Sequence, residues 1–261
     1  MKTIVYIDGY NLYYNRLSNT IHKWLDVVKL AELLVGEQDP GSTVELVRYF
    51  TAPILAKFAR RGQDSQIAQQ TYLRALSHVH PGRFDAVYGR HQGEVLPMMR
   101  HDPLKPPSKD DQVHVWRLVE KLTDVNLAMS MYRDVAKGAC EQIVLFSNDT
   151  DAEPALAAIR ADFPQVVIGV IAPLIPLQDA SGTGRGDEPL RPMSGLKNQA
   201  HWIRRSIPDA ALASAQLPAV IPTDKKAIKK PTHWHPVSAP DPTAAAPAAP
   251  EPINPTADGS A

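Results

Sequence analysis

The chain lacks several features that mark secreted and membrane proteins. Its 261 residues include a single cysteine, Cys140, which excludes a disulfide framework and a cysteine-based zinc cluster. No run of 18 or more apolar residues occurs, and Asp8 interrupts the apolar start where a secretory signal needs continuous apolar residues. We therefore expect a cytoplasmic protein that does not associate with membranes.

The chain also lacks net charge, since 28 Lys and Arg residues balance 28 Asp and Glu residues. Affinity for nucleic acid comes largely from Lys and Arg contacts with phosphates, so such a function would have to rest on local basic patches. Lys57, Arg60 and Arg61 form one candidate patch, and a lysine run at 225–230 forms another. Both patterns are also typical of an ordinary solvated surface.

Proline is concentrated in the last third of the chain, with fifteen of the 24 prolines at or after Pro173. Residues 217–261 contain too little apolar surface to offset the entropy of ordering them, which predicts a disordered Pro/Ala-rich C-terminal tail. Residues 178–194 are rich in turn formers and predict a loop. The expected organisation is a main domain at 1–175, a loop and C-terminal helical extension at 176–216, and a tail at 217–261.

Short apolar runs alternate with helical patterns in the first domain. The predicted strands are 3–8, 44–52, 83–90, 141–147 and 165–173. The predicted helices follow Asp26, Asp64 or Ser65, Thr123 and Asp151. Strands that alternate with helices indicate an α/β fold with a central, mostly parallel sheet covered on both faces. Residues 91–121 are expected to be a loop-rich insert.

Carboxylates follow two of these strands. Asp8 ends the first predicted strand, with Asn11 close behind it, and Asp149 and Asp151 follow the fourth. Asp124 lies in the first turn of the helix that leads into that fourth strand. Ligands of parallel sheets bind outside the carboxyl ends of the strands, and oxygen donors without His or Cys favour Mg²⁺ or Mn²⁺ over zinc.

A second interpretation of these acids is purely structural. An Asp after a strand or in the first turn of a helix is often a turn former or a cap, and this applies to Asp124 and Asp151 taken singly. The coincidence of three acidic sites at one predicted edge of the sheet favours a metal site. Spacing alone leaves the two interpretations open.

Five segments resemble the NYN domain, a branch of the PIN-like nuclease fold. They are YIDGYNLYY, KWLD, VRYFTAPI, TDVNLAMSMYRDVAKG and SNDTDAEPAL, and the similarity spans residues 1–175. The resemblance implies a PIN-like three-layer α/β/α sandwich with an acidic Mg²⁺ or Mn²⁺ pocket that cleaves RNA. By position it makes Asp8, Asp124, Asp149 and Asp151 both catalytic and metal-binding, with Asn11 beside them. Ala152 and Glu153 depart from the large apolar residue that the family often has there, which implies altered substrate contacts.

The expected function is therefore that of a metal-dependent endoribonuclease whose partner is RNA, with a homodimer left open. Some bacterial proteins with this domain are named 6-hydroxy-3-succinoylpyridine 3-monooxygenases, so an NADH-dependent hydroxylase of nicotine degradation is the alternative. No GxGxxG follows a predicted strand, and GTGRGD at 182–187 falls in a polar loop, so no dinucleotide-binding motif supports that alternative. A second alternative is an RNA-binding module without catalysis.

Overall fold

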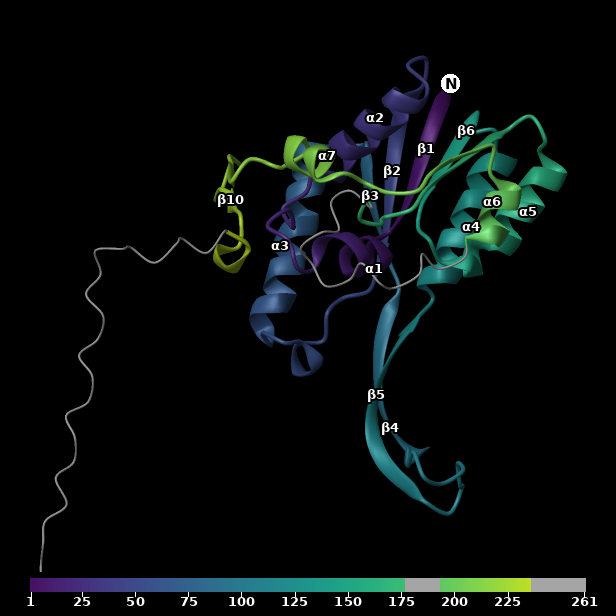
Figure 1. The fold of residues 1–261 in the computed structure, drawn as a ribbon. Helices are drawn as coiled ribbons and strands as arrows, with labels where there is room; N and C mark the ends of the chain where they lie inside the picture. The colour runs from purple at the N-terminus through teal and green to yellow at the C-terminus, as the bar shows by residue number, and fades with distance from the viewer. Residues whose placement is uncertain (177–192, 236–261) are drawn as a thin grey trace, which may run out of the picture.

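A computed structural model describes residues 1–176 and 193–235, and a six-stranded parallel sheet lies at its centre (Figure 1). The spatial order of the strands is β3-β2-β1-β6-β7-β8, and each neighbouring pair is parallel. The strands are β1 Lys2–Asp8, β2 Thr43–Thr51, β3 Phe84–Tyr88, β6 Gln142–Phe146, β7 Val167–Ile171 and β8 Trp202–Arg204. The five strands expected from the sequence are confirmed, and β8 adds a sixth.

Helices flank both faces of the sheet, which confirms the expected α/β architecture (Figure 1). On one side lie α2 Val27–Gln38, α3 Gln63–Val79 and α7 Asp209–Ser214, and on the other lie α4 Thr123–Ala136, α5 Glu153–Asp162 and α6 Ser194–Gln199. The short helices are α1 Gly9–Leu12, η1 Tyr13–Leu17, η2 Ala56–Phe58 and η3 Thr150–Ala152. None of the helices among the described residues is long and apolar enough to cross a membrane.

Alternation along the central strands creates two hydrophobic cores. Val5 and Ile7 of β1 pack with the side chains of α2 and α3, whereas Ile4 and Tyr6 pack with those of α4 and α5. Successive strand residues point to opposite faces, so a strand that is covered on both sides is apolar throughout. This is why β1 and β6 appear in the sequence as short continuous apolar runs.

A long β-hairpin projects from the body on the side where the strands of the sheet end (Figure 1). Its strands, β4 Arg90–Met99 and β5 Gln112–Lys121, pair antiparallel from Arg90 opposite Lys121 to Met99 opposite Gln112. We call this hairpin the arm. The expectation of a loop-rich insert at 91–121 is therefore wrong. Gly93 and Pro97 interrupt the strand pattern of β4. In addition, neither face of the arm packs on a core, so nothing imposes a regular alternation of apolar and polar residues on its sequence.

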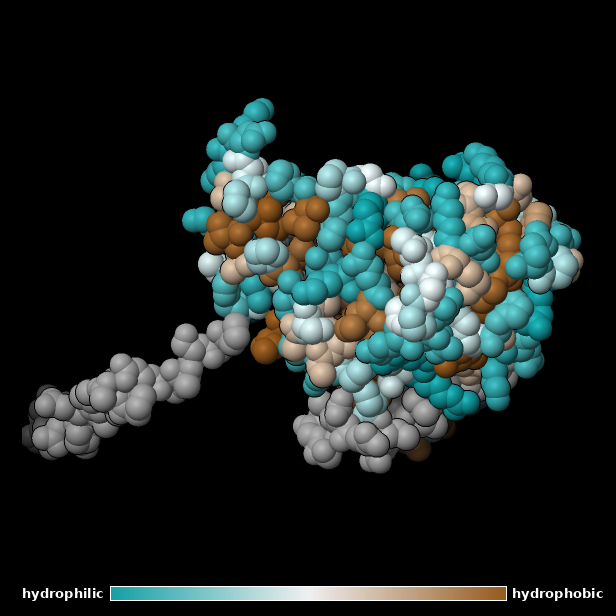
Figure 2. Space-filling model, turned by 90° about the horizontal axis from the view of Figure 1, so that it is seen from above, coloured by the Kyte–Doolittle hydropathy of each residue, from teal (hydrophilic) through white to brown (hydrophobic). Residues whose placement is uncertain are grey.

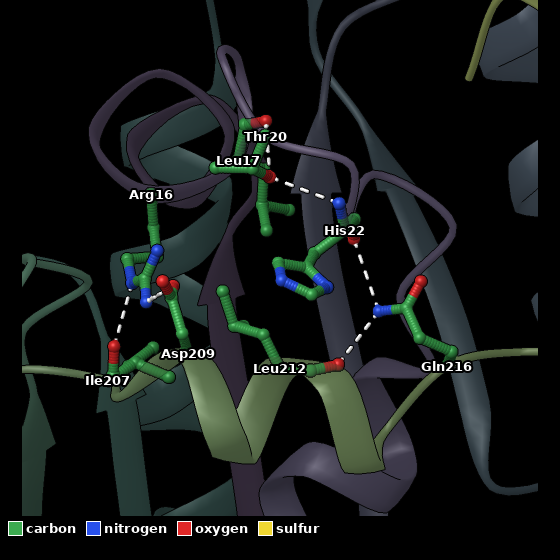
Figure 3. A network of polar contacts seen from close by, with 8 residues as sticks. All are labelled: Arg16, Leu17, Thr20, His22, Ile207, Asp209, Leu212 and Gln216. Atoms are coloured by element: carbon green, nitrogen blue, oxygen red, sulfur yellow. Dashed lines mark hydrogen bonds and ion pairs between the residues drawn. The ribbon is translucent and has the colours of Figure 1, made fainter. Parts of the chain in front are cut away.

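The segment that follows α6 belongs to the same structural unit as the sheet. Arg16 Nε donates to the Ile207 carbonyl at 2.7 Å, and its guanidinium pairs with Asp209 (Figure 3). Gln216 Nε2 donates to the His22 carbonyl at 3.4 Å in the same network (Figure 3). The extension expected at 176–216 also contributes a strand to the sheet, since β8 pairs with β7.

Residues 217–235 are folded, in contrast to the disorder expected for the tail. They form β9 Val220–Ile221, β10 Ile228–Lys229 and η4 Thr232–Trp234. Trp24 Nε1 donates to the Pro218 carbonyl at 2.8 Å, and the ring of Trp234 lies 6.1 Å from that of Trp24. A few apolar residues with specific sites in the core are enough to fix this proline-rich segment. Residues 236–261, the GTGRGD motif and most of the expected loop at 178–194 lie outside the described residues.

The amino edge of the sheet lies on the side of the body opposite the arm. Seen from above, this side shows mostly hydrophilic residues, with hydrophobic ones in several separate groups (Figure 2). The carboxyl ends of the strands and the base of the arm lie together on the far side from this view (Figure 1). The carboxyl side is therefore the place to look for a site.

Candidate active site

The strand order places a topological switch point between β1 and β6. From β1 the chain continues to β2 and β3 on one side, and from β6 it continues to β7 and β8 on the other. In open parallel sheets, the crevice outside the carboxyl ends of two such strands is the usual ligand site. Asp8 ends β1, and Ser147, Asn148 and Asp149 follow β6 directly.

A small pocket lies at this switch point. Its lining residues are Asp8, Asp124, Leu127, Ser147, Asp149, Asp151 and Ala152. All four acidic residues singled out in the sequence therefore line one pocket, although they come from β1, α4 and the β6–α5 connection. Asn11 is not among the lining residues.

Two of the pocket acids also cap helices. Asp8 is the N-cap of α1, and its Oδ1 accepts a hydrogen bond from the Asn11 amide at 3.0 Å. Asp149 is the N-cap of η3, and its Oδ1 accepts from the Asp151 amide at 3.0 Å. Asp8 and Asp149 therefore both cap and line the pocket, because a cap uses one carboxylate oxygen and leaves the other. The capping expected for Asp124 and Asp151 is wrong, since Leu122 and Ala152 are the N-caps of α4 and α5.

Asn11 connects the two strand ends from behind the pocket. Its Oδ1 accepts a hydrogen bond from the Asn148 amide at 3.2 Å, so α1 is fastened to the loop after β6. Asn15 Nδ2 adds a contact with Asn148 Oδ1 at 3.3 Å. The structure thus gives Asn11 a positioning contact between α1 and that loop.

Ser147 also lines the pocket, and it was not among the site residues expected from the sequence. Its hydroxyl donates to Asp8 Oδ2 at 3.3 Å and accepts from the Asp149 amide at 3.0 Å. The sequence does mark this position, because Ser147 is the first polar residue after the buried strand β6.

Like charges crowd around Asp8. Burial raises the pKa of the Asp8 carboxyl from its ordinary 3.8 to about 6, and the charges of Asp124, Glu120 and Asp149 act in the same direction. Burial also raises the pKa of Asp124, as do the charges of Asp149 and Asp151. A group of carboxylates that repel one another favours the uptake of either protons or a cation.

Glu120 is a fifth acid near the pocket, and the sequence analysis did not single it out. It is the penultimate residue of β5, accepts a hydrogen bond from the Thr123 hydroxyl, and lies close enough for its charge to act on Asp8. Burial raises its own pKa. Because residues 91–121 were expected to be a loop, nothing in the sequence placed Glu120 beside Asp8.

The donor atoms of the pocket suit a hard divalent cation, but they are not arranged as a preformed coordination shell. Its ionisable donors are carboxylates, the ligand type that Mg²⁺ and Mn²⁺ prefer. Within residues 1–176 and 193–235, however, no three or more His, Cys, Asp or Glu side chains are already arranged to hold a metal ion. Asp8, Asp124 and Asp149 are the residues that could do so after side-chain adjustment.

The turn that follows β1 does not fit the pyrophosphate of a dinucleotide. After β1 the chain reads Asp8-Gly9-Tyr10-Asn11, with a carboxylate where a Gly-rich loop would expose amides to phosphate. A side chain at Gly9 would meet the Tyr49 ring at 2.5 Å, so packing inside the protein accounts for this glycine. The switch point therefore repels a nucleotide phosphate that has no cation with it.

Comparisons with known proteins give one informative match. The chain is 37% identical over 250 residues to 6-hydroxy-3-succinoylpyridine 3-monooxygenase HspA of Pseudomonas putida, which covers 90% of this chain and 76% of that protein. No family model matches the chain. A solved protein of unknown function from Vibrio parahaemolyticus aligns over 78% of this chain and 91% of its own, with 12% identity. Its TM-score of 0.41 is too low to carry an argument.

Proposed function

The chain belongs to the family of the Pseudomonas putida 6-hydroxy-3-succinoylpyridine 3-monooxygenase, and we propose that the acidic pocket is its catalytic centre. The function that this pocket supports best is the hydrolysis of RNA phosphodiester bonds with Mg²⁺ or Mn²⁺. One observation carries the proposal, namely the four carboxylates that line a single pocket at the switch point. On this proposal the sheet is of the PIN-like type, with an NYN domain as the resemblance in sequence implies.

Each polar side chain of the pocket has a role in this proposal. Asp8, Asp124 and Asp149 hold the cation, and Asp151 binds it through water or orients a water molecule. Ser147 fixes the Asp8 carboxylate and the turn that carries Asp149. When bound, the cation lowers the pKa of a water molecule and offsets charge on the phosphoryl group.

Asp8 is the residue whose removal tests the proposal most directly. Purified Asp8→Asn and Asp149→Asn variants should lose at least a hundredfold in the rate of Mn²⁺-dependent cleavage of a labelled single-stranded RNA. Asp224→Asn is the matched control, because Asp224 is exposed and is not among the residues that line the pocket. Cleavage by both pocket variants at the parent rate would exclude the pocket as the site of hydrolysis.

The match to the P. putida enzyme favours a second candidate, the hydroxylation of a pyridine ring at the expense of NADH. The supporting observation is the 37% identity over 90% of the chain, whereas the first strand–helix turn does not favour it. NADH oxidation that depends on 6-hydroxy-3-succinoylpyridine and yields a ring-hydroxylated product would establish this activity. If the parent shows that reaction and no cleavage of RNA, the hydrolase proposal is wrong.

A further inference from the structure

Aromatic side chains lead from the acidic pocket to the base of the arm. The rings of Tyr10 and Tyr14 stack with centroids 5.9 Å apart, and the Tyr10 and His91 rings meet in a T-shaped arrangement with centroids 5.4 Å apart. Tyr10 lies two residues after Asp8, and His91 pairs across the arm with Glu120. This first group of rings therefore connects the turn after Asp8 to the base of the arm, where the charge of Glu120 acts on Tyr10.

A second group of rings continues along the arm. The centroids of Phe58 and Trp116 are 5.6 Å apart, and Lys57 Nζ lies 4.4 Å from the Trp116 ring and 4.8 Å from the Phe58 ring. A side chain at Gly93 would meet the Phe58 ring at 2.5 Å, so η2 packs closely against β4. Lys57 and Phe58 are thus held against the arm by contact with its backbone.

Both groups lie on the same face of the arm. His91, Gly93 and Val95 alternate along β4 and therefore share a face. Trp116 lies directly opposite Val95, so it shares that face as well. We call Tyr10, Tyr14, Phe58, His91 and Trp116 the aromatic strip.

Two rings of the strip are exposed, and the Lys57 ammonium lies beside the strip. Trp116 is 62% exposed and Tyr14 is 60% exposed, although rings used only for packing are normally buried. Lys57, Arg60 and Arg61 make no salt bridge with any carboxylate in the part of the chain that the structure describes. Exposed rings, together with a lysine that contacts them and has no carboxylate partner, provide the two contacts that an unpaired nucleic-acid strand requires.

We propose that the aromatic strip binds single-stranded RNA and directs it toward the acidic pocket. Bases stack on the exposed rings, above all Trp116 and Tyr14, while Lys57, whose ammonium lies 4.4 Å from the Trp116 ring, contacts phosphates. A duplex is excluded from this mode because its bases already stack on one another and present only their edges. The proposal names the form of the substrate for the hydrolysis proposed above. The binding of RNA to the strip does not depend on that function, whereas the delivery of the strand to the pocket rests on it.

Binding is measured separately from cleavage. Fluorescence anisotropy of a labelled 20-nucleotide oligouridine is recorded in EDTA, with a duplex RNA of equal length for comparison. The parent should bind the single strand at least tenfold more tightly than the duplex. Trp116→Ala should weaken binding of the single strand by about 5- to 100-fold, which is the range for the loss of one stacking platform.

Matched variants distinguish stacking from a general effect on the arm. Trp116→Phe should retain most of the affinity, and Lys57→Ala should lower both the affinity and its salt dependence. Met98→Ala is the control, because Met98 is 46% exposed on the opposite face of the arm and should bind as the parent does. Thermal unfolding of each variant verifies that it is folded.

The outcomes separate this proposal from the proposed hydrolysis. If folded Trp116→Ala and Lys57→Ala variants bind the single strand like the parent, or if the duplex binds equally well, the strip proposal is overturned. It is also overturned if the parent does not bind RNA, or if Trp116→Ala disrupts a dimer and leaves RNA binding unchanged. If the parent binds in the expected way but does not cleave RNA with Mn²⁺, the strip proposal stands and the hydrolysis proposal fails.

Discussion

The hydroxyl of Ser147 donates a hydrogen bond to Oδ2 of Asp8 at 3.3 Å, across the switch point between β6 and β1. The Ser147 hydroxyl oxygen in turn accepts a hydrogen bond from the Asp149 amide at 3.0 Å. One small side chain therefore sets the relative positions of two carboxylates that are 141 residues apart in the sequence. Ser147 is only 2% exposed, so water has little access to replace these two contacts.

Replacing Ser147 by Ala should slow Mn²⁺-dependent cleavage of RNA and shift its pH dependence. Without the hydroxyl the charged form of Asp8 loses a donor, so the pKa of that carboxyl rises further. We expect the acidic limb of the rate profile to move to higher pH and the affinity for Mn²⁺ to fall several-fold. Ser77→Ala is the control, since Ser77 donates only to a carbonyl within α3. An unchanged acidic limb would contradict this role of Ser147.

Asp8→Asn should stabilise the fold at neutral pH while it removes the proposed activity. The pKa of Asp8 is 3.8 in its ordinary state and about 6 in the fold, so the parent loses stability as pH rises through this window. An amide carries no charge to bury and can still cap α1. The stability advantage of the variant should grow between pH 4 and 6, then level off at about 1 to 3 kcal/mol.

Urea unfolding from pH 4 to 8 in EDTA measures this difference. The exposed Asp224→Asn variant should follow the parent at every pH. A variant whose advantage is the same at pH 4 and pH 7 would show that Asp8 does not titrate in this window. Addition of Mn²⁺ should raise the thermal unfolding temperature of the parent more than that of Asp8→Asn, because a ligand that binds the folded state stabilises it.

Asp134 ties α4, which carries Asp124, to the sheet. Its Oδ2 accepts from the Tyr6 hydroxyl at 3.0 Å and from Arg48 Nε at 2.8 Å, and the side chain is buried. Asp134→Ala should reduce the free energy of unfolding by about 3 kcal/mol, because it leaves a largely buried guanidinium with one partner fewer. Tyr6→Phe should reduce it by about 1 kcal/mol.

Chemical denaturation of the two variants tests the size and the order of these effects. Asp111→Ala removes an exposed ion pair with Arg100 and should cause a much smaller loss. Equal losses for Asp134→Ala and Asp111→Ala would contradict the structural role of Asp134.

Removal of the C-terminal segment should prevent stable folding. A chain that ends at residue 206 loses the carbonyl that Arg16 binds and the apolar residues Leu212 and Leu217, which belong to the core around Trp24. Circular dichroism and intrinsic tryptophan fluorescence should show loss of cooperative unfolding. A chain that ends at residue 235 retains these contacts and should unfold at the parent temperature, whereas a similar loss in both truncations would contradict the assignment.

The strands and most helices could be predicted because their signals are local. β1 and β6 are short continuous apolar runs, and Asp26 caps α2 by accepting the Lys29 amide at 3.0 Å, as expected. The acidic pocket followed from one further rule, that the carboxyl ends of parallel strands meet at one edge. Asp8 and Asp149 could be placed together on that rule without any knowledge of helix packing.

The arm, the folded C-terminal segment and the role of Ser147 depend on contacts between distant parts of the chain. β4 and β5 gain regular structure by pairing with each other, so no buried face imposes a pattern on their sequence. Residues 217–235 contain few apolar side chains, and their order comes from sites offered by Trp24 and Tyr72. Local composition could not reveal these sites.

Some features of the candidate site thus follow from the sequence, and others follow only from tertiary packing. The order of residues alone determined an α/β sheet with carboxylates at its carboxyl edge, because strand periodicity and capping act over a few residues. Tertiary packing decided that Glu120 joins those carboxylates, that Ser147 positions Asp8, and that exposed rings line the approach. Each of these depends on side chains more than 20 residues apart, whose proximity is set by the burial of two cores and by no local pattern.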